Sequence, residues 1–315
     1  MTLEWLSPGE ILAANAVSVA RSCACLLARR VLRDSSRVSS EYHSGHWARV
    51  LEGRVWERAT SLEEFLVGAR KHSVVAKVDG KFCRLGCDEF YRYRLGALAQ
   101  VARAALGEEG DIVELGCGFG YNLFALALAF PGRRFIGLDV SSNGIDAARA
   151  IANHFGLDDR MQFETLDLTR ADDPNFALLR GRAAFSYFCI EQIPYEIEQV
   201  VTNILAAGPC RVLHVEPTVE FLSLWRPKDW ANYFYVKSVD YQTRLFGVLC
   251  GLEQRGLLRV RETGRIPFAP TIQNDGFIAV WEPTVERTSH ECDVLHVALK
   301  KEATWQYGAL QNGIK

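Results

Sequence analysis

A strand, a glycine-rich loop and a helix follow one another between residues 111 and 132, and this order constrains the fold most. The segment reads Asp111-Ile-Val-Glu-Leu-Gly-Cys-Gly-Phe-Gly-Tyr-Asn122, and an apolar run to Phe130 ends at Pro131-Gly132. Glycines let backbone approach a ligand closely because they carry no Cβ. A second apolar strand ends on Asp139, near the spacing at which an acid meets ribose hydroxyls in nucleotide-binding βαβ units. The pattern predicts a nucleoside-containing cofactor.

The position after Gly120 bears on which cofactor is bound. A dinucleotide fingerprint, G-x-G-x-x-G, would place its third glycine at position 121, which is Tyr121. The chain instead has Glu114 two residues before Gly116, followed by Gly118 and Gly120. This pattern resembles the first motif of the class I S-adenosylmethionine-dependent methyltransferases, whose second strand also ends in a ribose-binding acid. The resemblance covers roughly residues 95–283.

The resemblance implies an α/β fold with a doubly wound, seven-stranded, mostly parallel sheet, and S-adenosyl-L-methionine as the cofactor. Its cofactor residues fall on the glycine loop, the ends of the next two strands and the turn after the fourth: Glu114, Gly116, Cys117 (through its backbone amide), Gly118, Gly120, Tyr121, Asp139, Val140, Asp167, Leu168 and Phe188. The family places an acid at Asp167 against the adenine amino group. A capping role for Asp167 ahead of Thr169 is the alternative.

A fourth strand is expected from residue 183 and leads into Ile190-Glu-Gln-Ile-Pro194. This segment resembles the element after strand four in many small-molecule methyltransferases. Gln192 stands where that family shows a histidine, so no base is carried over at that position. Glu191 is expected close to the methionine end of the cofactor.

Candidate general bases lie at the ends of the expected strands and in an N-terminal segment. A fifth strand at 210–217 carries His214 and Glu216 at its carboxyl end, where doubly wound sheets bind ligands. With Glu191 they form one group of candidates, and His43 and His46 form a second. In the alternative interpretation His214 points into the sheet, Glu216 caps a turn, and the two N-terminal histidines are solvent-exposed loop residues.

Aromatic residues in two appended segments are the expected substrate contacts. Tyr42 and Trp47 belong to a lid-like segment at 41–47, and an insert at about 218–245 holds Trp225, Trp230, Tyr233 and Tyr235. Rings with polar tips can form the walls of a site for an organic molecule. Helical spacing in the insert equally allows a core stripe.

We expect residues 1–90 to form a mainly helical cap with a short hairpin at 74–82, where Asp79-Gly80 supplies the turn. Residues 91–283 form the catalytic domain, and residues 284–315 form a C-terminal extension. Glu10 and Arg21 interrupt the apolar stretch from Ile11 to Leu27, so neither a targeting peptide nor a membrane partner is expected. The helix in this stretch could pack on its own domain or on a second subunit, as in a homodimer.

Charge and cysteine usage narrow the class of protein further. A formal net charge of -2 and the absence of a basic stripe argue against nucleic acid as a partner. Nine scattered cysteines indicate reduced thiols and a cytoplasmic protein, and no metal site is expected at Cys83 and Cys87. We therefore expect a methyltransferase that acts on a small organic metabolite or natural-product intermediate, most often at oxygen or nitrogen. The alternatives are an NAD(P)-dependent oxidoreductase and a non-catalytic methyltransferase-like binding subunit.

Overall fold

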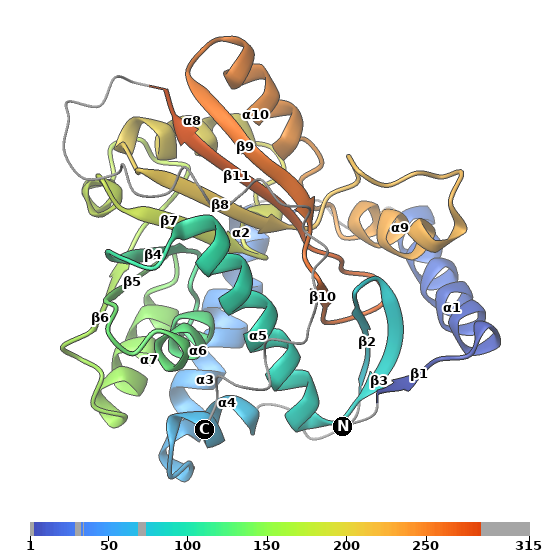
Figure 1. Ribbon diagram of the computed structural model, residues 1–315, viewed down its shortest axis with the longest axis horizontal. Coiled ribbons are helices and arrows are strands. Elements are labelled where there is room, and N and C mark those ends of the chain that lie inside the picture. Colours follow the sequence, from blue (N-terminus) through green and yellow to red (C-terminus); the bar gives the residue numbers. More distant parts are fainter. Residues whose placement is uncertain (1–2, 29–32, 34, 69–73, 285–315) are drawn as a thin grey trace.

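A seven-stranded sheet forms the centre of the computed structural model, which describes residues 3–28, 33, 35–68 and 74–284 (Figure 1). The expected C-terminal extension lies outside these residues, apart from its first residue. The strand order is β6-β5-β4-β7-β8-β11-β9, and only β11 runs against the others. The strands are β4 (Ile112–Leu115), β5 (Phe135–Asp139), β6 (Met161–Thr165), β7 (Ala183–Tyr187), β8 (Arg211–Glu216), β9 (Leu258–Arg265) and β11 (Phe277–Pro283). The expected doubly wound, mostly parallel fold is confirmed.

Helices cover both faces of this sheet, which is why β4 and β7 are buried along their whole length and mostly apolar. One face carries α5 (Cys87–Leu106), α6 (Tyr121–Ala129) and α7 (Ser142–His154), and the other carries η3 (Pro174–Leu179), α8 (Ile197–Ala207) and α10 (Leu245–Gln254). After β4 the chain forms β5 and β6 on one side of β4 in the sheet. It then crosses over and forms β7 and β8 on the other side of β4. The strand order therefore reverses at β4, where such sheets bind ligands.

A second sheet joins the N-terminal region to the C-terminal half. Its order is β1-β3-β2-β10, with β1 (Glu4–Trp5), β2 (Val74–Val78), β3 (Lys81–Leu85) and β10 (Phe268–Ala269). The expected hairpin is present, and its turn residues Asp79 and Gly80 both have positive φ, at 49° and 74°. Because β10 pairs with β2, the expected cap is bound to the rest of the chain through a shared sheet.

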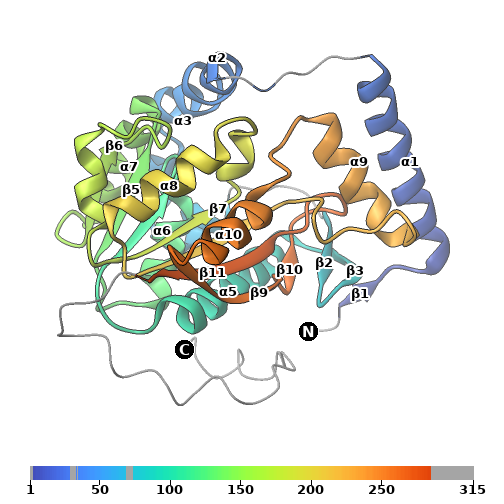
Figure 2. The same cartoon turned by 90° about the horizontal axis from the view of Figure 1, so that it is seen from above.

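The N-terminal helices fall into two groups. Helix α1 (Pro8–Leu27) lies beside α9 (Trp230–Ser238) at one edge of the molecule (Figures 1 and 2). The second group packs beside α5, α6 and α7, and consists of α2 (Ser35–Val38), the π-helix η1 (Ser39–Trp47), α3 (Ala48–Gly53), η2 (Val55–Arg58) and α4 (Leu62–Val67). Two further short helices, η4 (Ile190–Gln192) and η5 (Pro227–Asp229), lie at the carboxyl end of β7 and before α9.

Candidate functional site

The glycine loop turns sharply between β4 and α6 because all three of its glycines have left-handed backbone. Their φ angles are 74° at Gly116, 53° at Gly118 and 84° at Gly120. The amides of Gly116 and Cys117 donate to the Leu138 carbonyl at 2.7 and 3.0 Å, which fixes the loop to β5. A Cβ on Gly116 would lie 1.9 Å from the Cys189 sulfur, so the loop and the turn after β7 pack together only through a glycine.

Asp139 lies at the carboxyl end of β5, beside this loop. Its two carboxylate oxygens accept hydrogen bonds from the amides of Gly118 and Ser141, each at 2.8 Å. Burial raises the pKa of Asp139, and these bonds oppose that effect. Val140, the next residue, is 61% exposed. A carboxylate held in place by backbone amides beside an exposed apolar residue fits a ribose with an adenine next to it.

His43 lies on the Asp139 side of the loop. Its Nδ1 is 3.0 Å from the hydroxyl of Ser141, and its carbonyl accepts from the Asn143 side chain at 3.0 Å. These contacts hold η1 on the start of α7, and the role of His43 as a general base stays a prediction. His46 is exposed and contacts Arg49 and the ring of Trp47, and its role as a base likewise stays a prediction.

Glu114 is fully buried under the loop, and only one of its carboxylate oxygens has a partner. Oε1 accepts from Asn122 at 2.7 Å, whereas Oε2 has no hydrogen-bond partner among the described residues. Burial raises the pKa of Glu114 to about 8. An orphaned carboxylate oxygen at this depth fits a cationic group of a ligand, such as an ammonium.

Arg94 of α5 reaches the same place from the other side. It donates to the Asn122 side chain at 3.1 Å, and its guanidinium lies 4.4 Å from the centre of the Tyr121 ring. Arg94, Asn122 and Tyr121 line a small cavity with Tyr91, Leu95, Leu98 and Ala125. The hydroxyl of Tyr121 donates to the Leu66 carbonyl at 3.0 Å and so ties α4 to this wall.

Asp167 follows β6, and its side chain caps the next turn. Its Oδ1 accepts from both the amide and the hydroxyl of Thr169, at 2.9 and 2.7 Å. The capping alternative is thus present in the structure, while the contact to adenine stays a prediction. Leu168 is buried in the core beneath it.

A tight turn after β7 places Glu191 in the interior. Phe188 has a left-handed backbone, with φ 54°, and leads into η4. The carboxylate of Glu216 accepts from the amides of Cys189 and Glu191 at 3.1 and 3.2 Å and from the Ser186 hydroxyl at 2.5 Å. Glu216 therefore shapes the turn, as a cap would. Burial and the neighbouring Glu216 raise the pKa of Glu191 well above its usual range.

His214 is a core residue. It is fully buried in β8, its Nδ1 lies 2.9 Å from the Ser186 hydroxyl, and its ring packs 6.2 Å from that of Trp281. Burial lowers the pKa of His214 to about 3, so the imidazole is neutral at physiological pH. The expectation of His214 as a catalytic base is corrected, because the side chain points into the sheet.

Tyrosines from η1, α9 and the segment after α9 gather around Glu191. The Glu191 carboxylate is one cause of the raised pKa values of Tyr42, Tyr235 and Tyr241, although burial is the largest cause for each. Tyr235 and Tyr241 meet edge to face, with centroids 5.9 Å apart. We call Tyr42, Glu191, Tyr235 and Tyr241 the tyrosine cluster.

Arg33 packs against the tyrosine cluster, over the ring of Tyr241. Its Nε donates to the Gln192 side chain at 2.5 Å, a terminal nitrogen pairs with Glu41 at 3.1 Å, and the guanidinium lies 5.1 Å from the centre of the Tyr241 ring. Its amide donates to Asp240 at 2.8 Å. These bonds hold the N-terminal cap at Arg33 against the turn after β7 and the segment after α9.

The remaining aromatic residues of the insert are not brought to this cluster. Trp225 is 94% exposed, and Trp230 is partly exposed and donates to the Leu224 carbonyl at 2.9 Å. Tyr233 contacts Phe234. Of the expected substrate residues, Tyr42 and Tyr235 thus lie beside Glu191, whereas Trp225 and Trp230 are exposed; the substrate role of all four stays a prediction. Trp47 packs on the glycine loop instead.

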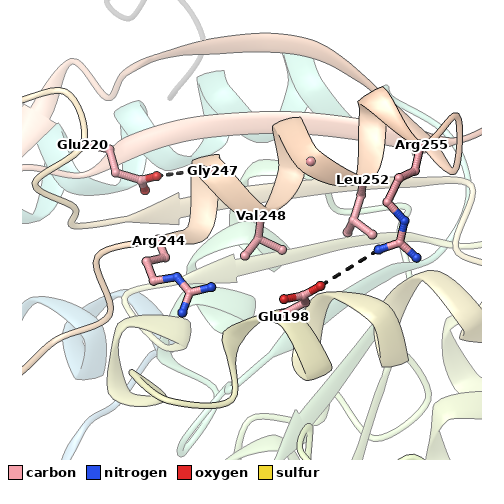
Figure 3. A pocket seen from close by; sticks show the side chains of 8 residues that line it. Glu198, Glu220, Arg244, Gly247, Val248, Leu252 and Arg255 are labelled. Atoms are coloured by element: carbon pink, nitrogen blue, oxygen red, sulfur yellow. Dashed lines mark hydrogen bonds and ion pairs between the residues drawn. The ribbon is translucent and has the colours of Figure 1, made fainter.

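A larger groove lies elsewhere, between α8 and α10 (Figure 3). Glu198 faces Arg255 across it at 3.9 Å, and Glu220 accepts from the amide of Gly247 at 2.7 Å. None of the residues that line this groove belongs to the glycine loop or the tyrosine cluster.

Sequence reasoning did not find Arg33, Arg94 or Tyr241. Arg94 lies within α5, which precedes the strand and glycine loop of the motif, and α5 also carries Arg92 and Arg103. No feature of the sequence distinguishes Arg94 from these two arginines. Tyr241 lies within the aromatic insert at about 218–245 but was not among its expected substrate residues, and Arg33 lies outside any motif. The fold brings both of them to Glu191.

Residues 113–208 match the model of a family described as a methyltransferase domain. No curated protein matches the chain in sequence. The matched segment holds the glycine loop, Asp139 and the turn after β7, in the strand order given above. The resemblance to class I S-adenosylmethionine-dependent methyltransferases is thus confirmed, and such a domain implies S-adenosyl-L-methionine as the cofactor.

Solved structures show a more remote similarity to the chain, with low sequence identity. A geranyl diphosphate methyltransferase in complex with sinefungin has a TM-score of 0.47 at 15% identity and is matched over 76% of this chain and 99% of its own. A geranyl diphosphate C-methyltransferase from Streptomyces coelicolor A3(2) has a TM-score of 0.49 at 13% identity, over 75% and 98%. An O-methyltransferase from neocarzinostatin biosynthesis has a TM-score of 0.45 at 19% identity, over 62% and 55%. No residue role is transferred from them.

Proposed function

We propose that this protein transfers the methyl group of S-adenosyl-L-methionine to oxygen or nitrogen of a small organic metabolite or natural-product intermediate. One observation carries the proposal. A buried acid, Glu191, lies among three tyrosines at the carboxyl end of β7, one strand away from the glycine loop and two from Asp139. The glycine loop and Glu191 thus lie at the same edge of the sheet, where the parallel strands have their carboxyl ends.

The cofactor would be held at three points. Asp139 would accept from the ribose hydroxyls, because its oxygens already lie at the strand end and each can accept a further hydrogen bond. Glu114 would meet the ammonium of the methionine end with its orphaned oxygen. Arg94 would pair with the carboxylate of the same end, since guanidinium and carboxylate form strong paired hydrogen bonds.

The tyrosine cluster would bind and orient the acceptor. When bound, the cofactor supplies a methyl group activated by its positively charged sulfur. Glu191 would remove the proton from the acceptor oxygen or nitrogen, and the tyrosine rings would exclude water. Orientation of the two reactants could contribute about 7–11 kcal/mol of barrier lowering, and a positioned base about 10²–10⁴-fold in rate.

Titration calorimetry with S-adenosylhomocysteine, NAD and NADP tests the cofactor assignment and separates the oxidoreductase alternative. We expect binding of S-adenosylhomocysteine alone, weakened about tenfold or more by Asp139→Ala and unchanged by Asp146→Ala, an exposed aspartate of α7. Tight binding of NAD instead would overturn the assignment.

Incubation of the protein and labelled S-adenosylmethionine with a cell extract tests the reaction. Label should appear in a small molecule with the native chain and not with Glu191→Gln. Binding without any label transfer across extracts would favour the non-catalytic binding subunit. We also propose a cytoplasmic site of action, supported by the absence of disulfides among the eight described cysteines.

A further inference from the structure

Helix α1 leaves much of its apolar surface exposed, and its two most buried residues are serines. The two residues of α1 that are fully buried are Ser18 and Ser22, and Ser18 donates a hydrogen bond to Gln273. Leu12, Val17 and Leu27 are 72%, 70% and 86% exposed. Between them the exposed stripe is filled by small residues at three- and four-residue spacing, namely Ala13, Ala16, Ala20 and Ala24.

The exposed apolar surface distinguishes α1 from an ordinary helix of a water-soluble domain, which turns its apolar stripe to the core. By length and composition α1 could cross a membrane, and little of the helix is buried in the protein. Glu10 does not interrupt the apolar side, because it lies in the first turn and forms a capping box with Ser7. The apolar side thus presents Arg21 as its one charged residue beyond the first turn.

Exposed cations and aromatic residues lie on α1 itself, just before it, and in and before α9, which packs beside it. Arg226, Lys228 and Lys237 are exposed, and none of them has a carboxylate within ion-pairing distance among the described residues; the same holds for Arg21. Trp5 is half-exposed before α1, and Trp225 is almost fully exposed before α9. Figures 1 and 2 show α1 and α9 together at one edge of the molecule.

We propose that this edge docks on the surface of an anionic phospholipid bilayer, with α1 lying in the interface plane. Apolar side chains would enter the boundary between headgroups and acyl chains, tryptophans would lie at headgroup level, and the four cations would face anionic lipid. The sequence alone predicted no membrane partner, because Glu10 and Arg21 were taken to interrupt the apolar stretch. Docking of this edge goes beyond the proposed methyl transfer and does not depend on it.

Two other occupants fit the observations less well. A second copy of the chain would bring the same patch against itself, so that the unpaired cations of both copies would share one interface. A spanning arrangement would pull α1 away from α9 and carry Ser18 into hydrocarbon without its present partner, Gln273.

Vesicle sedimentation of the full chain tests the proposal. Wild-type protein should sediment with vesicles of phosphatidylcholine mixed with phosphatidylserine, and less with phosphatidylcholine alone. The double variant Leu12→Glu, Val17→Glu should lower binding to the mixed vesicles about tenfold or more, because two apolar anchors are lost. Leu128→Glu, an exposed leucine of α6, is the matched control and should bind as wild type.

A second variant tests the charge contribution. Arg226→Gln with Lys228→Gln should weaken binding to the anionic vesicles and leave binding to phosphatidylcholine unchanged. Circular dichroism on each variant shows that loss of binding is not loss of folding.

Three results would overturn the proposal. The first is wild-type protein that sediments with neither vesicle at low salt, and the second is equal loss of binding in Leu128→Glu. The third is light scattering that shows a dimer which Val17→Glu converts to a monomer, with no vesicle binding by wild type. That result would assign the surface to a second copy of the chain.

Discussion

The indole ring of Trp47 lies directly on the backbone of Gly118. A Cβ on Gly118 would come within 2.6 Å of the Cζ2 atom of Trp47, and Gly144 at the start of α7 lies under the same ring. The N-terminal cap therefore contacts the backbone of the glycine loop through this aromatic side chain. The position of the cap and the shape of the loop are linked at this contact.

The first prediction concerns this contact. Gly118→Ala should destabilise the fold and weaken S-adenosylhomocysteine binding, because φ of 53° is unfavourable for a residue with a Cβ and the methyl would strike Trp47. Gly118→Val should abolish binding altogether. Gly132→Ala, where a Cβ meets nothing within 4 Å, is the control, and thermal denaturation with calorimetry measures both effects. A Gly118→Val variant with near-native affinity would show that the loop has no part in cofactor binding.

The second prediction concerns proton release from Glu114. Because burial raises the pKa of Glu114 to about 8, the carboxyl is mostly protonated at pH 7. An ammonium bound at its orphaned oxygen would favour the carboxylate, so cofactor binding should release a proton near pH 7. Calorimetry in buffers of different ionisation enthalpy measures that proton, and Glu114→Gln should abolish its release. The idea fails if the binding enthalpy of the native chain is independent of the buffer.

The raised pKa of Glu114 also predicts how the free energy of unfolding changes with pH. An acid whose pKa is higher in the folded state than in the unfolded state holds its proton longer when folded, so stability falls as pH rises between the two values. For Glu114 this window runs from its ordinary value of 4.5 to about 8. The slope from this one group is at most about 1.4 kcal/mol per pH unit. Urea denaturation of the native chain against Glu114→Gln across that window should show the smaller decline in the variant.

The order of elements was readable from the sequence, whereas the contacts between distant segments were not. The strand β4, the loop and Asp139 are local in sequence, so their periodicity and spacing predict them. Trp225 was expected among the substrate residues because it lies in the aromatic insert, and in the fold its ring is exposed to solvent.

The surroundings of the candidate bases could not be predicted from the sequence either, because they depend on contacts between distant segments. A histidine at a strand end is equally compatible with the core and with the site, and only the pairing of β8 between β7 and β11 decides that His214 lies inside. Arg33 meets Gln192 across 159 positions of sequence, a contact that no local pattern encodes.

The third prediction separates the two ends of the cofactor. Arg94→Ala should weaken binding of S-adenosylhomocysteine about tenfold or more, since a charge-assisted pair typically contributes about 1.5–3 kcal/mol. Binding of methylthioadenosine, which lacks the amino acid portion, should be unchanged. Arg92→Ala, an exposed neighbour on α5, is the matched control. Equal weakening of both ligands by Arg94→Ala would mean that Arg94 supports the fold rather than the carboxylate.

The last prediction concerns Glu191 and its place in the reaction. Burial and the nearby Glu216 hold the pKa of Glu191 well above its usual range, so the acid must lose a proton before it can accept one from the acceptor. Turnover should therefore rise with pH through the neutral range. Glu191→Gln should lower kcat by about 10²–10⁴-fold and leave S-adenosylhomocysteine affinity within about twofold, because the amide keeps the shape and loses the basic oxygen. Glu196→Gln, an exposed glutamate in the same segment, should leave both quantities and the pH profile as they are in the native chain. If Glu191→Gln methylates its acceptor at the native rate with the same pH dependence, the acceptor proton leaves by another route, and the tyrosine cluster serves to hold the substrate alone.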